Sequence, residues 1–263
     1  MKNELLEIAV KASLDAGAEI MKIYTDPSQD FGIERKADNS PLTLADKAAH
    51  RTIMQYLEPT GIPVLSEEGA HEAYEKRADW KQFWLVDPLD GTKEFIKKNG
   101  EFTVNIALIE NGEPVMGVVY LPAQDVLYYG DVKEGAYRKK GEVLERLPLA
   151  TAKHDDYVIV ASRSHLSAET QVFIDEAVKK HDSVRTVSSG SSIKICLVAE
   201  GSADAYPRFA PTMEWDTGAG DAVVRAAGRM CLQAGTYDGL PFDDGKPLQY
   251  NKKDLHNPWF LVK

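Results

Sequence analysis

Residues 84–95 of this 263-residue chain read Trp84-Leu85-Val86-Asp87-Pro88-Leu89-Asp90-Gly91-Thr92-Lys93-Glu94-Phe95. The apolar run from Phe83 to Val86 predicts a short buried strand. Pro88 is expected to end this strand, because proline has no backbone N–H and a fixed φ. A helix is predicted to begin at Thr92 and run to Ile96. The stretch therefore predicts a strand, a tight turn and a helix start in immediate succession.

Two carboxylates lie in that turn. Asp87 and Asp90 are three residues apart and can point into one small volume, where they repel each other unless a cation lies between them. A hard divalent ion is the natural occupant, with the Leu89 carbonyl as a third ligand. Gly91 allows close backbone approach, and the amides of a helix start suit a phosphate. The alternative is an acidic turn in a solvated loop, with Asp90 as the helix N-cap.

Composition and charge narrow the class of protein. With 43% hydrophobic and 27% charged residues, the chain is ordinary globular material. No run approaches the roughly 20 apolar residues of a membrane helix, and the N-terminus lacks the apolar core of a signal peptide, so we expect a soluble, cytoplasmic protein without a membrane span. The formal charge of −10 argues against a nucleic-acid polymer as partner. A small phosphate ester remains a possible substrate, because bound divalent cations reverse the sign of the local charge.

The two cysteines, Cys196 and Cys231, form no close pair and have no zinc spacing. We expect both to be buried, reduced thiols. A disulfide between them is the alternative.

The first half of the chain predicts helices around an antiparallel sheet. Helical spacing predicts a helix from about Asn3 to Tyr24, and a Thr43–Asp46 capping box opens a second helix that runs to about Leu57. A hairpin is expected around the turn at Asn111-Gly112. The predicted strands are Phe31–Arg35, Ile62–Leu65, Thr103–Ile109, Val115–Leu121, Val126–Tyr129 and Ala136–Arg138.

The second half predicts an α/β layer. The polar stretch from Ala150 to Asp156 places a boundary between an α+β lobe over 1–153, with most of the metal ligands, and an α/β lobe over 154–263 that closes the site. Strands and helices then alternate, which favours an α/β arrangement. The strands are Tyr157–Ala161, Val184–Val187 and Ala205-Tyr206, and the helices are Ser167–Lys180, Ile193–Glu200 and Trp215–Ala227.

Three separated motifs are similar to those of the lithium-sensitive, magnesium-dependent phosphatase superfamily of inositol monophosphatase. They are Ser66-Glu67-Glu68-Gly69, Asp87-Pro88-Leu89-Asp90-Gly91-Thr92 and Glu214-Trp215-Asp216-Thr217. The segments Lys36–Thr43 and Gly190–Lys194 most resemble its 3'(2'),5'-bisphosphate nucleotidase branch, including the bacterial form linked to sulfur assimilation. The resemblance covers nearly the whole chain and implies a layered αβαβα sandwich of α/β class.

The resemblance implies a site for two or more Mg²⁺ ions. One ion would be held by Glu67, Asp87 and the Leu89 carbonyl, and a second by Asp87, Asp90 and Asp216. Glu67 is preferred to Glu68 by its place in the motif. The alternatives are a solvated acidic loop for the glutamates and a helix N-cap for Asp216.

The resemblance also assigns Asp46 and Thr92 to aiming the attacking water, although capping alone explains Asp46 structurally. The expected reaction is hydrolysis of a phosphomonoester by in-line attack of a metal-activated water. The residues expected to contact the substrate at the reacting end are Glu67, Leu89, Asp90, Gly91, Thr92 and Asp216.

Specificity is expected to come from the second lobe. Ser191, Lys194 and Arg208 match places where bisphosphate nucleotidases hold the other phosphate and the base, and His165 is expected to face the adenine. The alternatives are surface ion pairs for Lys194 and Arg208 and a plain loop position for His165. Asp221 departs from the branch pattern and can face either the metals or solvent.

The resemblance implies hydrolysis of 3'-phosphoadenosine 5'-phosphate to AMP and phosphate, by a monomer or homodimer. An inositol or sugar phosphate phosphatase with the same metals is one alternative. A non-catalytic, metal-dependent phosphate sensor is the other.

Overall fold

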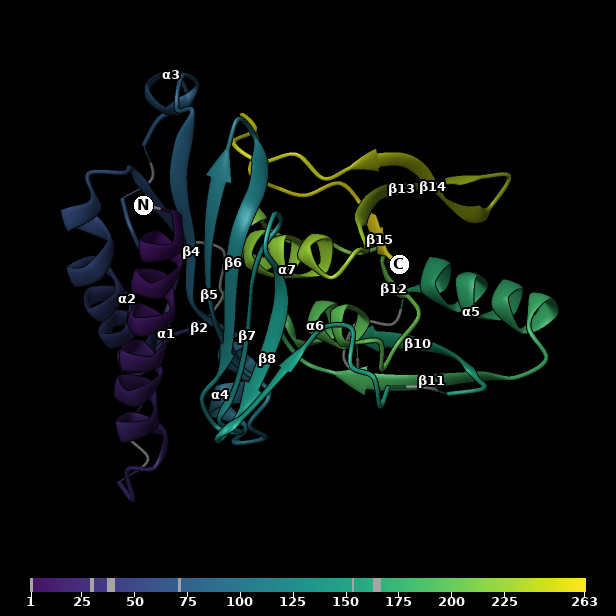
Figure 1. Ribbon diagram of the computed structural model, residues 1–263, viewed down its shortest axis with the longest axis horizontal. Coiled ribbons are helices and arrows are strands. Elements are labelled where there is room, and N and C mark those ends of the chain that lie inside the picture. The colour runs from purple at the N-terminus through teal and green to yellow at the C-terminus, as the bar shows by residue number, and fades with distance from the viewer. Residues whose placement is uncertain (1, 29–30, 37–40, 71, 153, 163–166) are drawn as a thin grey trace.

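The computed structural model describes residues 2–28, 31–36, 41–70, 72–152, 154–162 and 167–263, and its elements stack in five layers (Figure 1). Helices α1 (Lys2–Tyr24) and α2 (Leu44–Leu57) cover one face of a large sheet. Helices α6 (Ile193–Glu200) and α7 (Glu214–Ala226) lie on its other face, followed by further strands and then by α5 (Ala168–Lys180). The predicted αβαβα sandwich is therefore confirmed.

The large sheet has seven strands in the order β3-β4-β5-β6-β7-β8-β9. Only β3 and β4 pair in parallel, so the predicted antiparallel sheet is confirmed apart from this edge. Strand β9 is not predicted from the sequence. The bounds are β3 (Val64–Ser66), β4 (Gln82–Asp90), β5 (Thr103–Glu110), β6 (Glu113–Leu121), β7 (Val126–Asp131), β8 (Gly135–Lys140) and β9 (Val143–Arg146). Shorter elements flank this sheet: β1 (Glu34–Arg35), β2 (Pro41–Leu42), a 3-10 turn (Glu58–Thr60), α3 (Tyr74–Arg77) and α4 (Thr92–Ile96).

Pro88 does not end β4, and that prediction is wrong. The strand continues to Asp90 through a β-bulge, since Asp87 pairs with Asn105 while Asp90 pairs with Thr103. A bulge leaves residues without a ladder hydrogen bond, and a proline without an N–H is tolerated there. The bulge re-aims the side chains at the end of β4, where both carboxylates lie.

The predicted strands and helices from residue 157 to α7 are confirmed to within a few residues. Strands β10 (Tyr157–Ser162) and β11 (Val184–Ser189) pair in parallel, and β12 (Tyr206–Arg208) belongs to a separate sheet. Three strands after α7 were not predicted: β13 (Cys231–Tyr237), β14 (Leu240–Pro247) and β15 (Phe260–Val262). With β12 they form an antiparallel sheet in the order β12-β15-β13-β14.

Strand β4 is buried on both faces, which explains its continuous apolar run. Trp84 and Val86 belong to the core beneath α1 and α2, whereas Phe83 and Leu85 belong to the core shared with α6 and α7. Cys196 and Cys231 lie in this second core as free, buried thiols, as predicted.

Glycines let α7 approach the sheet closely. A Cβ added at Gly117 of β6 would lie 2.2 Å from the carbonyl oxygen of Ala219, and one added at Gly218 would lie 2.7 Å from Leu85 Cδ2. Gly218 thus permits close packing of α7 against Leu85. The N-terminal half of α7 is thereby held against the sheet that carries β4.

Among the described residues, no helix is both long enough and apolar enough to cross a lipid bilayer.

Candidate metal and phosphate site

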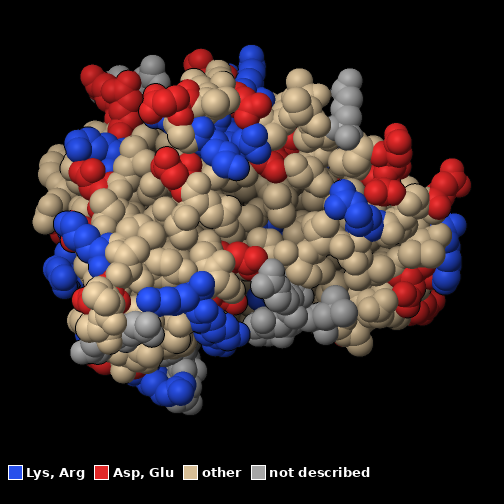
Figure 2. Space-filling model, turned by 90° about the horizontal axis from the view of Figure 1, so that it is seen from below, with Lys and Arg blue, Asp and Glu red and all other residues tan. Residues whose placement is uncertain are grey.

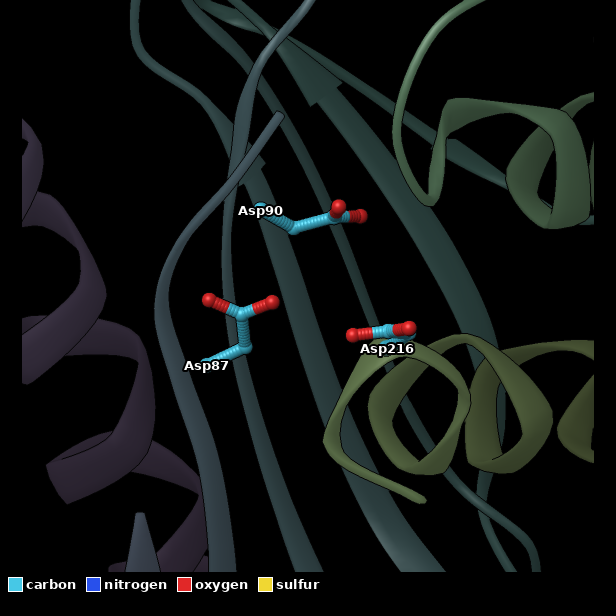
Figure 3. A group of neighbouring side chains, drawn as sticks. All are labelled: Asp87, Asp90 and Asp216. Atoms are coloured by element: carbon cyan, nitrogen blue, oxygen red, sulfur yellow. The ribbon is translucent and has the colours of Figure 1, made fainter. Parts of the chain in front are cut away.

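Three carboxylates converge where β4 ends and α7 begins. Asp87 and Asp90 come from the bulged end of β4, and Asp216 comes from the first turn of α7. Each offers an oxygen that lies within 4.8 Å of the others, and Figure 3 shows the three groups turned toward one volume. The convergence joins residues that are far apart in the sequence.

The electrostatics of this cluster are unfavourable without a cation. Burial raises the pKa of Asp87 well above its usual range, and the charges of Glu67, Asp90 and Asp216 raise it further. Burial and then the charge of Asp90 do the same to the pKa of Asp216. A hard divalent cation with oxygen ligands would relieve this repulsion, so the residues present fit such an ion.

Glu67 lies beside this cluster. Its charge raises the pKa of Asp87, and its own pKa is raised, chiefly by burial, with Lys36 opposing the rise. Lys36 Nζ lies 2.6 Å from Glu67 Oε1 and also contacts Glu68. The glutamates therefore share an ammonium and are not a freely solvated acidic loop.

The Leu89 backbone lies inside the bulge. Its N–H donates to Asp87 Oδ1 at 3.0 Å, which fixes that carboxylate. Its carbonyl accepts a long hydrogen bond of 3.4 Å from the Thr92 hydroxyl. The Leu89 backbone therefore contacts Asp87 through its N–H and Thr92 through its carbonyl.

Asp46 and Thr92 meet although 46 residues separate them. Thr92 Oγ1 donates to Asp46 Oδ1 at 3.3 Å, while Asp46 Oδ2 accepts from the backbone N–H of Thr43 at 2.7 Å and from its hydroxyl. The predicted capping box is confirmed, and it uses only one carboxylate oxygen. Burial, opposed by the Thr43 hydrogen bonds, raises the pKa of Asp46 to about 6.

Neither aspartate is the N-cap residue of its helix, so the N-cap alternative is wrong for Asp90, whereas Asp216 still caps α7 from the third helical position. The N-cap of α4 is Gly91 at φ 94°, where an added Cβ would lie 3.0 Å from the Glu101 carbonyl oxygen. The N-cap of α7 is Met213, whose N–H donates to Asp216 Oδ2 at 2.8 Å. Asp216 is the third residue of that helix.

A cavity of about 470 Å³ opens beside the cluster. Asp90 and Asp216 line it, and so do Ser191, Lys194 and Arg208. The site therefore joins an acidic end to a wall that carries Lys194 and Arg208. The cavity is also lined by Lys93, Lys97, Glu94 and Glu101.

Lys194 is buried, and the surface ion-pair alternative is wrong for it. Its side chain is 5% exposed, and Nζ donates to the carbonyl oxygens of Ser191 at 2.6 Å and Ser189 at 3.3 Å. Burial lowers the pKa of Lys194 to about 8. Its ammonium also lies 5.4 Å from the centre of the Tyr206 ring.

Arg208 and Ser191 complete this wall. Arg208 Nη2 donates to the Pro211 carbonyl at 3.1 Å, and its Nε is buried without a hydrogen-bond partner among the described residues. Ser191 adopts φ 50°, and its hydroxyl lies 2.7 Å from Thr103 Oγ1. His165 lies outside the described residues.

Sequence reasoning missed Ser192 and Asn105. Ser192 Oγ lies 2.7 Å from both Asp90 Oδ2 and the Asp216 carbonyl oxygen, so its single proton serves one at a time. Asn105 Nδ2 donates to Ser192 Oγ at 2.9 Å. Asn105 could have been found from register, because it is directly opposite Asp87 in the sheet.

Asp221 faces neither the carboxylate cluster nor solvent, which corrects both options left open by the sequence. It is fully buried and pairs with Arg225 through contacts of 2.9 and 3.1 Å. It also accepts a hydrogen bond of 2.9 Å from the Tyr250 hydroxyl. Asp221 is therefore a structural partner within α7.

The chain is similar in sequence to known proteins over nearly its whole length. The profile of the Inositol monophosphatase family matches residues 1–257. The chain is 45% identical over 262 residues to the 3'(2'),5'-bisphosphate nucleotidase CysQ of Escherichia coli K12, covering 98% of this chain and 99% of that protein. It is 31% identical over 266 residues to the nucleotidase of the same name from Haemophilus influenzae, covering 100% and 93%.

Two solved structures have the same fold as this chain. The crystal structure of CysQ from Bacteroides thetaiotaomicron, a bacterial member of the inositol monophosphatase family, superposes with a TM-score of 0.89 at 52% identity and covers 99% of this chain and 97% of that one. The extragenic suppressor protein SuhB from Bartonella henselae superposes with a TM-score of 0.73 at 25% identity, covering 88% and 87%.

Proposed function

Because this chain belongs to the inositol monophosphatase family, we propose that it is a metal-dependent 3'(2'),5'-bisphosphate nucleotidase. It would hydrolyse 3'-phosphoadenosine 5'-phosphate to AMP and phosphate. Full-length similarity to proteins named for nucleotidase activity supports the substrate. The observation that carries the proposal is the single cavity that joins Asp90 and Asp216 to Lys194 and Arg208.

The carboxylates would hold Mg²⁺, because every proposed ligand is a hard oxygen. The ligands are Asp87, Asp90 and Asp216, with Glu67 and the Leu89 carbonyl beside them, and we propose two or more ions. When bound, such ions lower the pKa of a water and stabilise charge on the leaving oxygen. Lys36 would balance the charge of Glu67 and Glu68 at the edge of the site.

Asp46 and Thr92 would orient the attacking water. When the Thr92 hydroxyl donates its one hydrogen bond to Asp46 and not to the Leu89 carbonyl, its lone pairs remain free to accept a hydrogen bond from water. That hydrogen bond would direct the water's own lone pair toward phosphorus. The amides of Gly91 and Thr92 at the start of α4 would contact the phosphoryl oxygens.

The second phosphate would be recognised by the cationic wall. Arginine and lysine bind phosphate oxygens well, and the Arg208 Nε has no other partner among the described residues. A substrate with one phosphate would leave Arg208 Nε without a phosphate acceptor. His165 is proposed to face the adenine. The face of the molecule in Figure 2 mixes acidic and basic side chains without a continuous basic surface, which suits a small substrate better than a polymer.

A three-substrate assay tests this proposal. Phosphate release would be measured from 3'-phosphoadenosine 5'-phosphate, inositol 1-phosphate and fructose 1,6-bisphosphate, with and without Mg²⁺ and Li⁺. We expect Mg²⁺-dependent, Li⁺-inhibited release with preference for the nucleotide. Lys194→Ala should raise KM for the nucleotide far more than for inositol 1-phosphate.

The possible results separate the alternatives. Equal rates on all three substrates, or an equal effect of Lys194→Ala on both KM values, would contradict the nucleotide assignment. Preference for inositol 1-phosphate or fructose 1,6-bisphosphate would favour an inositol or sugar phosphate phosphatase. Absence of turnover would favour a phosphate sensor.

A further inference from the structure

Glu214 is a buried carboxylate that the proposed reaction does not use. Its side chain has 0% exposure, and it lies two residues before Asp216 at the first position of α7. Placing another negative charge so close to the cluster is costly unless strong hydrogen bonds compensate it. The partners of Glu214 therefore indicate what it does.

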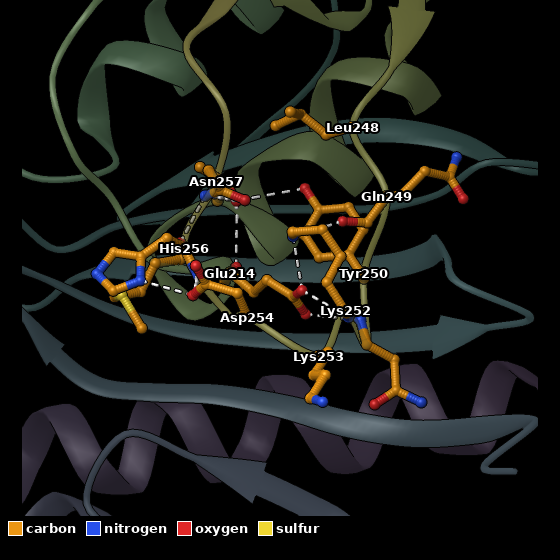
Figure 4. A network of polar contacts seen from close by, with 12 residues as sticks. Glu214, Leu248, Gln249, Tyr250, Lys252, Lys253, Asp254, His256 and Asn257 are labelled. Carbon is orange, nitrogen blue, oxygen red and sulfur yellow. Dashed lines mark hydrogen bonds and ion pairs between the residues drawn. The ribbon is translucent and has the colours of Figure 1, made fainter. Parts of the chain in front are cut away.

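Those partners all come from one segment, residues 248–257. Glu214 Oε2 accepts the backbone N–H of Asn251 at 2.7 Å, and Oε1 accepts the backbone N–H of Lys252 at 2.9 Å and its ammonium at 2.6 Å. Figure 4 shows the segment gathered around Glu214. Charge-assisted bonds to backbone amides fix the carboxylate in direction as well as in position.

The same segment binds the first turn of α7 at a second point. Asn257 Nδ2 donates to the Met213 carbonyl at 2.7 Å and to Thr217 Oγ1 at 3.0 Å. The Glu214 N–H donates to the Leu255 carbonyl at 3.0 Å. Asp216 thus lies within a helix turn that is held on both sides.

The segment also binds the chain just before β4. Arg77, which ends α3 and is 3% exposed, donates to Asn251 Oδ1 at 2.7 Å and to the Lys253 carbonyl at 3.2 Å. Asn251 Nδ2 donates back to the Arg77 carbonyl at 2.7 Å. Because Arg77 lies five residues before the start of β4 at Gln82, one segment connects the first turn of α7 to the chain that leads into β4.

We propose that residues 248–257 act as a brace, with Glu214 as its positioning residue, that sets Asp216 against Asp87 and Asp90 for divalent-cation binding. Three like charges push α7 and β4 apart, and the brace opposes this separation. A cation site tolerates only small displacements of its ligands, so loosening the brace would weaken binding of the cation before it unfolds the chain. This inference rests on the metal role proposed for the three aspartates.

Calorimetric titration with Mg²⁺ in the absence of substrate tests the brace independently of nucleotidase activity. Glu214→Gln replaces one carboxylate oxygen with an NH2 group, which faces a hydrogen-bond donor of the segment and cannot accept from it, and we expect the variant to weaken Mg²⁺ binding about tenfold or more. Glu200→Gln is the matched control. Glu200 is also buried, at 4% exposure, and binds Arg138 and Tyr128 at the far end of α6. It should lose similar thermal stability without a change in Mg²⁺ affinity.

Lys252→Met is the milder variant, because it removes only the ammonium and leaves both amide contacts with Glu214 in place. We expect it to fold and to weaken Mg²⁺ binding by less than Glu214→Gln. Equal loss of affinity in Glu200→Gln and Glu214→Gln, or unchanged affinity in folded Glu214→Gln or Lys252→Met, would overturn the brace. A wild-type protein that binds no Mg²⁺ would instead overturn the metal role and the brace with it, whereas tight Mg²⁺ binding without nucleotide turnover would overturn only the nucleotidase assignment.

Discussion

The negative charge of Asp90 raises the pKa of both Asp87 and Asp216. Asparagine at this position keeps the shape and removes the charge. We therefore expect Asp90→Asn to raise the unfolding free energy of the metal-free protein by about 1 kcal/mol, as changes that relieve functional strain commonly do. The same variant should lower phosphate release by about a hundredfold, since the proposed role of Asp90 as a metal ligand would be lost.

Urea unfolding in the presence of a chelator and a phosphate-release assay measure the two effects. Asp182→Asn, at an exposed position, is the matched control and should change neither. A destabilised Asp90→Asn would contradict the repulsion described for the cluster.

Lys194 should give the substrate affinity a pH dependence. Burial lowers its pKa to about 8, so the folded protein loses this proton more easily than an exposed lysine would, and the cationic fraction falls as pH rises through 8. The KM for 3'-phosphoadenosine 5'-phosphate should therefore rise about tenfold between pH 7 and pH 9. Initial rates at fixed, saturating Mg²⁺ measure this, and Lys194→Met should show a high KM with little pH dependence. A wild-type KM that stays constant over this range would exclude the ammonium from the binding site.

At the residue scale, the motifs predicted that Asp87, Asp90 and Asp216 would converge and that Asp46 would lie beside Thr92. Their assigned roles remain predictions. Lys36 and Ser192 were missed as members of the site because their partners are far away in the sequence: Lys36 contacts Glu67, and Ser192 contacts Asp90. Spacing rules describe neighbours along a helix or strand and carry no information on such pairs.

Among the elements, α7 depends on a small residue in the facing strand. A Cβ at Gly117 would lie 2.2 Å from the Ala219 carbonyl oxygen, and backbone cannot move aside as a flexible side chain can. We expect Gly117→Ala to lower the unfolding free energy by about 3 kcal/mol, the upper range for overpacking. Denaturant unfolding monitored by circular dichroism measures it.

Gly235→Ala in β13 provides the matched control. An added Cβ there would meet Phe242 at 3.5 Å, an ordinary contact, so stability should change little. Comparable losses in both variants would show that glycine flexibility, and not close packing of α7, is what matters at Gly117.

The elements predicted well are those with strong local patterns. The helix α2 has a capping box, and β5 and β6 have an Asn-Gly turn between apolar runs. Strand β14 was missed because it is mostly exposed and contains Asp243, Asp244 and Gly245, which resemble a loop. The continuation of β4 past Pro88 was not predicted because the bulge forms by pairing with β5. Residues near Pro88 in the sequence do not indicate this pairing.

For the whole molecule, the repulsion among the clustered carboxylates makes stability depend on the cation. Under the proposed metal role Mg²⁺ would bind only the folded cluster, so a concentration of one hundred times its Kd should raise the unfolding free energy by about 2.7 kcal/mol. Differential scanning calorimetry with Mg²⁺ or with a chelator measures the shift. Asp90→Asn should show a much smaller shift, and an equal shift in both proteins would place the Mg²⁺ elsewhere.

The proposed boundary between 153 and 154 remains a prediction. One buried apolar cluster includes Leu85 and Val119 from before it and Val160 and Val198 from after it. Composition along the chain can indicate a polar connection, but it does not show that cores on the two sides are continuous.

The order of the last sheet has a consequence for how the chain is made. Strand β15 pairs with β12 on one side and β13 on the other, so this sheet cannot close until residues 260–262 have left the ribosome. Asp90 is synthesised 126 residues before Asp216 (216 − 90), which corresponds to about 6–25 s at bacterial and eukaryotic rates of about 5–20 residues per second. During that interval a nascent chain carries β4 with an incomplete set of carboxylates, and the cluster can form only after α7 has been synthesised.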